Sequence, residues 1–139
     1  MGMIHTQDSI LHFLEAVVGL DDIAADADIF RDLGVTGDDF HEMIAKYAST
    51  FSVDMNGYLW YFHANEEGQS IGGLFVFFPY ERVQRIPVTP AMLTDFANKG
   101  RWDIEYPAHD IPPKRYDLLI NLIVTVLFFV GLIVWLLMR

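Results

Sequence analysis

The C-terminal part of the chain contains an uninterrupted run of residues without a charge, at positions 118–138. As a helix, at about 1.5 Å rise per residue, this run would cross roughly the 30 Å apolar core of a bilayer. Asn121 and Trp135 lie near its two ends, where polar and aromatic side chains suit the membrane interface. The sequence therefore predicts a single C-terminal transmembrane helix over about 118–138. The residues expected to contact lipid include Leu118, Phe128, Phe129 and Trp135.

The rest of the chain is strongly acidic. Residues 1–113 contain 6 basic and 18 acidic residues, a net charge of −12. This charge disfavours nucleic acid and anionic lipid headgroups as direct partners of this part and favours a protein with a basic surface. At roughly 110 residues it is long enough for one small core. We therefore expect an acidic domain over 1–113 and a membrane anchor over 114–139.

The flanks of the apolar run predict its orientation. Lys114 and Arg115 precede the run, and Arg139 alone follows it. Basic residues near a membrane span tend to remain in the cytoplasm. The first ten residues also lack the basic and apolar regions of a secretory signal. These features predict a cytoplasmic N-terminal domain.

Capping residues and apolar spacing predict three helices in the acidic domain. The first runs over 8–19 with Asp8 as N-cap, the second begins near Thr36 or Gly37, and the third runs over 89–100. The expected core positions on these helices are Ile10, Phe13, Leu14, Val17, Phe40, Met43, Ile44, Tyr47, Phe51, Met92, Leu93, Phe96 and Ala97.

Two aromatic runs between the second and third helices are too short for periodicity to classify. Residues 58–62 and 73–78 could each form a short strand or a buried helical turn. Trp102 and Tyr106 follow the third helix, and we expect both to pack back onto the domain. The predicted fold class is mainly α, with short strands left open, followed by the single transmembrane helix.

The segment that leads into the second helix reads FRDLGVTGDDF over residues 30–40. With its Asp32-Leu33-Gly34 stretch, it resembles the region around the attachment site of acyl carrier proteins. In that family a serine at the start of the second helix carries a phosphopantetheine arm. The position of that serine falls on Gly37 here, which has no hydroxyl group. The resemblance therefore implies a carrier-like helical fold without the cofactor.

The downstream part carries a second resemblance. Tyr61-Phe62 followed by Glu66, and then IPVTP at 86–90 leading to Gly100-Arg101-Trp102, is similar to an uncharacterised enterobacterial family of small acyl-carrier-protein-like proteins. This resemblance covers most of residues 8–106 and implies a fold and a bacterial setting. Together with the predicted orientation, it implies a single-pass protein of the bacterial inner membrane.

In carrier proteins the acidic second helix is also the surface that partners recognise. The resemblance therefore implies a docking surface, for which the alternative is that the charges only keep the domain soluble. The candidate docking residues are Asp32, Asp38, Asp39 and Glu42.

Metal binding and catalysis have little support in the sequence. Asp26 and Asp28 could open a calcium loop, but Phe30 and Arg31 stand where an oxygen ligand and a glycine are needed. The five histidines are scattered, and we expect each at the surface or partly buried. No nucleophile elbow or phosphate-binding loop is present. We expect no metal, no cofactor and no enzymatic activity.

Two functions remain open at this point. The first is a membrane-anchored protein-interaction module that docks a basic partner on the acidic second helix. The second is a small membrane protein that regulates or neutralises a toxin, a secretion component or a transporter through its transmembrane helix.

Overall fold

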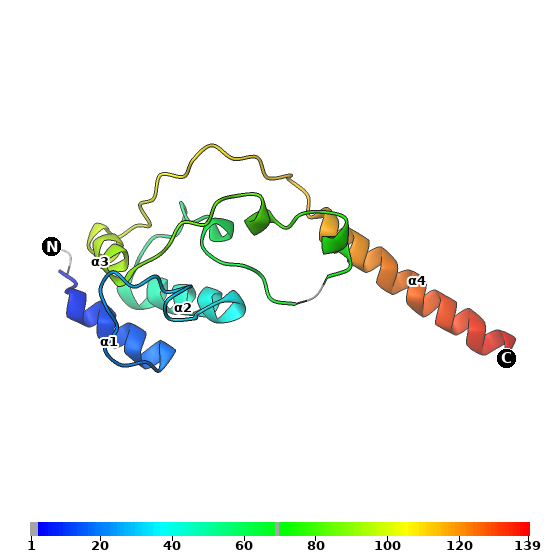
Figure 1. The fold of residues 1–139 in the computed structure, drawn as a ribbon, viewed down its shortest axis with the longest axis horizontal. Helices are drawn as coiled ribbons and strands as arrows, with labels where there is room; N and C mark the ends of the chain where they lie inside the picture. Colours follow the sequence, from blue (N-terminus) through cyan, green and yellow to red (C-terminus); the bar gives the residue numbers. More distant parts are fainter. Residues whose placement is uncertain (1–2, 69) are drawn as a thin grey trace.

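The computed structural model describes residues 3–68 and 70–139, in which three short helices pack together and a long helix projects from the other end (Figure 1). Within these residues no strand is present, and the two aromatic runs contain helical turns, so the mainly α fold is confirmed. A single parallel bridge joins Asp54 to Arg101. The α-helices are α1 (Gln7–Val18), α2 (Gly37–Phe51), α3 (Pro90–Lys99) and α4 (Tyr116–Met138). The 3₁₀ turns are η1 (Trp60–Phe62), η2 (Gly72–Leu74) and η3 (Pro79–Glu81).

The predicted N-cap of α1 was wrong by two residues. Thr6, not Asp8, is the N-cap, and its hydroxyl accepts a hydrogen bond from the Ser9 N–H. Asp8 lies in the first turn, where its charge complements the helix dipole. The end of α1 at Gly19 is confirmed. The caps predicted for α3 at Thr89 and Gly100 are also confirmed.

The core of the domain lies where α1, α2 and α3 meet. The apolar face predicted for α2 is buried at all five positions. Ile10 and Leu14 of α1 and Leu93 of α3 are fully buried, and the Tyr47 hydroxyl donates to the Leu93 carbonyl oxygen across 2.5 Å. Burial of this apolar surface supplies the main driving force for the fold. The hydrogen bond of Tyr47 fixes α2 against α3.

His63 is fully buried, contrary to the expectation for the histidines. Its Nδ1 lies 2.9 Å from the Ile86 carbonyl oxygen, and its Nε2 lies 2.7 Å from the Tyr106 hydroxyl oxygen. That oxygen accepts from the Trp102 indole N–H and the Leu59 N–H, so we infer that its own proton is donated to Nε2. His63 is then neutral with its proton on Nδ1. Burial lowers the pKa of His63 to about 4.

Trp102 and Tyr106 pack back onto the domain, as predicted. Trp102 is 4% exposed, and its ring lies edge-on to those of Tyr58 and His63. The Tyr106 ring lies 4.8 Å from that of Phe62. These aromatic contacts pack the segment that follows α3 against η1 and the residues around it.

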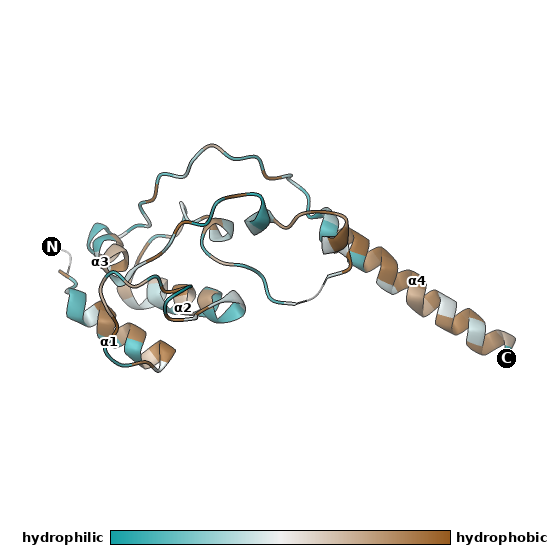
Figure 2. Cartoon of the chain, viewed as in Figure 1, coloured by the Kyte–Doolittle hydropathy of each residue, from teal (hydrophilic) through white to brown (hydrophobic). Residues whose placement is uncertain are grey.

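Within the described residues, α4 is the one helix long and apolar enough to cross a membrane, and it begins two residues before the predicted span. Figure 2 shows its apolar surface along most of its length. Leu118, Phe128, Phe129 and Trp135 are each more than half exposed. The helix therefore exposes a continuous apolar surface of the kind that could span a bilayer.

Candidate docking site

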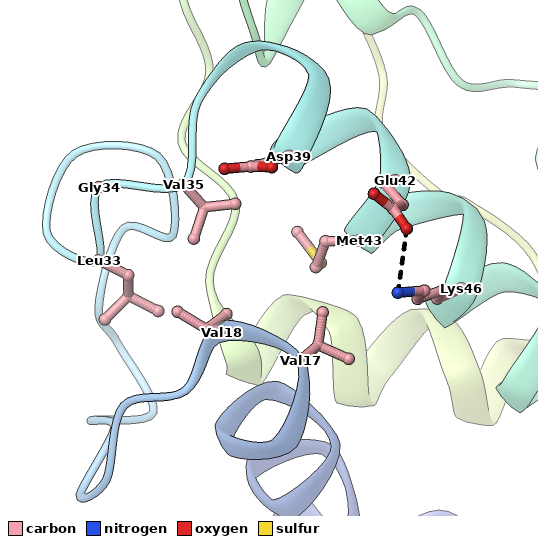
Figure 3. A pocket seen from close by; sticks show the side chains of 9 residues that line it. All are labelled: Val17, Val18, Leu33, Gly34, Val35, Asp39, Glu42, Met43 and Lys46. Carbon is pink, nitrogen blue, oxygen red and sulfur yellow. Dashed lines mark ion pairs between the residues drawn. The ribbon is translucent and has the colours of Figure 1, made fainter.

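A cavity of about 240 Å³ opens between the end of α1, the loop before α2 and the exposed side of α2 (Figure 3). Five of its nine lining residues are apolar, and the three charged ones, Asp39, Glu42 and Lys46, all come from α2. The cavity is lined by Val17, Val18, Leu33, Gly34, Val35, Asp39, Glu42, Met43 and Lys46.

The loop before α2 is held in place by a buried carboxylate. Asp28 is 3% exposed and accepts hydrogen bonds from the backbone N–H groups of Phe30 and Arg31. Both of its oxygens are also paired with the Arg85 guanidinium, one of them across 3.1 Å to Nη1. The guanidinium lies 4.9 Å from the centre of the Phe30 ring. This carboxylate therefore stabilises the loop structure.

The charge state of Asp28 follows from these contacts. Burial on its own raises the pKa of Asp28, but the hydrogen bonds and charge of Arg85, helped by the two backbone N–H groups, outweigh burial. The pKa of Asp28 is consequently held below 3.8. The ion pair with Arg85 is intact at neutral pH.

The structure brings together two of the four candidate docking carboxylates. Asp39 and Glu42 line the cavity, and Glu42 pairs with Lys46 one helical turn later across 3.1 Å. Asp38 is exposed at the first turn of α2 but does not line the cavity. Asp32 is engaged in the loop, where it accepts from the Asp28 N–H across 2.8 Å. Asp39 and Glu42 are therefore the carboxylates best placed to meet a partner at the cavity.

Gly37 begins α2 in a conformation that suits glycine. Its φ is +52°, and a Cβ added there would lie 2.0 Å from Cγ of Glu67. Its N–H donates to the Asn65 side-chain oxygen across 2.9 Å, and the N-cap residue Thr36 makes no cap hydrogen bond with its side chain. The segment 65–67 thus covers Gly37, and any larger residue there would require both backbone strain and movement of Glu67.

Of the residues that line this cavity, only Asp39 and Glu42 were predicted from the sequence as docking residues. Lys46 lies four residues after Glu42, and this spacing could have signalled the ion pair. No pattern in the sequence marked Val18 as a cavity residue, because its place there depends on how the end of α1 packs against the loop before α2. Among the residues that the structure describes, no group of three or more His, Cys, Asp or Glu side chains could hold a metal ion.

The arrangement defines a small helical domain with an acidic cavity, joined to an apolar helix. Residues 8–105 match the model of a family described as a protein of unknown function, DUF1493, and the chain belongs to this family. The match ends before α4. No curated protein matches the chain, and no solved structure matches it.

Proposed function

We propose that the chain is a membrane-anchored, non-enzymatic protein-interaction module that docks a partner with a basic surface. The observation that supports this most is the cavity that combines apolar side chains with the carboxylates of Asp39 and Glu42. A lysine or arginine side chain combines an apolar stem with a cationic head, which matches both features. Asp38 and Asp39 are exposed in the first turn of α2, where their carboxylates are accessible to a partner.

The proposal includes a carrier-like origin without carrier chemistry. Three packed helices and the Asp32-Leu33-Gly34 loop that leads into α2 support the likeness to acyl carrier proteins. Gly37 and the Glu67 side chain over it support the loss of the phosphopantetheine arm. A true carrier delivers cargo by diffusion, whereas this domain precedes a helix that suits a membrane.

We further propose that the chain is a single-pass protein of the bacterial inner membrane, of enterobacterial type, with its acidic domain in the cytoplasm. Lys114 and Arg115 on the domain side of α4 support this orientation. The domain would then present the cavity close to the cytoplasmic face of the bilayer.

The first prediction concerns charge reversal on α2. Changing Asp38, Asp39 and Glu42 to lysine will lower partner affinity roughly tenfold or more, since attraction to a basic surface becomes repulsion. The measurement is crosslinking of the full-length chain in native membranes, followed by purification and quantification of each bound protein. The amount of partner crosslinked to the wild-type chain will also fall as the salt concentration is raised.

The matched control changes three other exposed carboxylates, Asp21, Glu105 and Asp110, to lysine. This variant has the same net charge as the first, and we expect it to keep the partner. Retention of every bound protein by the α2 variant would contradict the proposal. If the partner were lost only when residues 118–138 are exchanged for an unrelated apolar helix, recognition would lie in the bilayer instead.

A further inference from the structure

The loop at residues 70–78, which includes η2, exposes large apolar side chains although it lies outside α4. Leu74 is 81% exposed, Phe75 is 73% exposed and Phe77 is 71% exposed. Such a group of exposed apolar side chains marks an interaction surface. In Figure 1 the loop lies beside the first turns of α4.

Hydrogen bonds join this loop to Asn121 in the second turn of α4. The Gly72 N–H donates to the Asn121 side-chain oxygen across 2.8 Å, and the Asn121 amide nitrogen donates to the Ser70 hydroxyl across 2.6 Å. Asn121 lies three residues inside the uncharged run, about 4.5 Å along the helix from Leu118. Because an unsatisfied amide is costly in an apolar medium, the loop provides the partners that Asn121 needs in a bilayer.

The packing of the loop on α4 is close. A Cβ added at Gly72 would lie 2.1 Å from the Asp117 carbonyl oxygen. Just before the loop, Glu66 forms a bidentate ion pair with Arg115, with nitrogen–oxygen distances of 2.9 and 2.7 Å. The same guanidinium also pairs with the buried carboxylate of Asp117. The loop therefore keeps a fixed height relative to the start of α4.

Basic side chains lie next to the apolar ones. The Arg82 guanidinium donates to the Phe77 carbonyl oxygen across 3.2 Å, and Lys114 lines the same small cavity as Phe77 and Arg82. Both cations are exposed. Although residues 1–113 are acidic as a whole, the apolar side chains with Arg82 and Lys114 beside them form a local surface that matches the acyl boundary and the headgroup phosphates of a bilayer.

We propose that residues 71–78 insert into the interfacial layer of the bilayer that α4 spans, so that the domain contacts the membrane at a second point. This inference rests on the membrane anchoring in the proposed function. The continuity of the loop with α4 identifies lipid as its occupant. Two contacts restrict rotation of the domain and would hold the cavity at a defined orientation to the membrane surface.

The test uses single cysteines, since the natural chain has none. Full-length Phe75→Cys, labelled with the environment-sensitive fluorophore NBD, is reconstituted into vesicles of phosphatidylcholine and phosphatidylglycerol. We expect a blue-shifted emission that is quenched more by shallow than by deep nitroxide lipids and little by iodide. Ser49→Cys on the exposed side of α2 serves as the water control, and Leu127→Cys in α4 serves as the span control.

Each outcome decides between the inference and its alternatives. Quenching of the Phe75 label by iodide, with lipid quenching of the Leu127 label, would overturn insertion and leave the span intact. Protection of the Phe75 label from both quenchers would also overturn it, because protein would then cover the loop. Loss of lipid quenching at Leu127 would refute the span itself. Adding Gly72→Val, which displaces the loop from α4, should reduce lipid quenching at Phe75 but not at Leu127.

Discussion

Replacing Asp28 with alanine will lower the free energy of unfolding by about 2 kcal/mol, because it removes a buried carboxylate from an ion pair whose Arg85 partner is 30% exposed. The change leaves Arg85 without its carboxylate and leaves the N–H groups of Phe30 and Arg31 without an acceptor. The loop that forms one wall of the cavity would lose its main constraint. The measurement is urea unfolding of the full-length chain in detergent, monitored by near-ultraviolet circular dichroism.

Asp26→Ala is the matched control for this change. Asp26 lies two residues earlier in the same loop and is exposed, so its loss should change stability by less than about 0.5 kcal/mol. Asp28→Asn keeps the shape and one acceptor oxygen and should fall between the two. An Asp28→Ala variant as stable as Asp26→Ala would show that the ion pair does not hold the loop.

The second large effect is a dependence of stability on pH that comes from His63. Its pKa is about 4 in the folded chain and about 6.5 when unfolded, so between these values the unfolded state binds more protons. Stability therefore falls as the pH is lowered from about 6.5 towards 4, by roughly 3 kcal/mol in total. The slope between pH 6 and 5 should approach about 1.4 kcal/mol per pH unit.

The measurement is a series of urea unfolding curves between pH 7 and 5. His63→Gln should lower stability at pH 7, since it disturbs the bonds to Ile86 and Tyr106, and should remove most of the slope. His12→Gln changes a histidine whose side chain is 80% exposed and should keep the slope. Equal slopes in wild type and His63→Gln would contradict a buried, neutral His63.

The elements that could be predicted from the sequence depend on residues that lie close together along the chain. The five apolar positions of α2 share one face because of helical spacing, and all five are buried. Thr89 and Gly100 act on the first and last turns of α3, so their identity alone predicts its ends. The length and composition of α4 likewise needed no tertiary information.

The features that could not be predicted depend on contacts between distant residues. Asp28 and Arg85 are 57 residues apart, and nothing local marks either as a partner of the other. The Glu67 side chain lies over Gly37, and the Asn65 side chain, 28 residues away, accepts from the Gly37 N–H. A single histidine such as His63 looks the same in sequence whether buried or exposed. The cavity depends on such contacts, so only its acidic members were predicted.

The central claim is that α4 crosses a bilayer once, with the acidic domain in the cytoplasm. Cysteines placed singly at Ser49 in the domain and at Arg139 at the far end of α4 test it with a membrane-impermeant maleimide. We expect Ser49→Cys to react only in inverted vesicles and Arg139→Cys only in right-side-out vesicles. Reaction of both positions from the same face of the membrane would contradict the account.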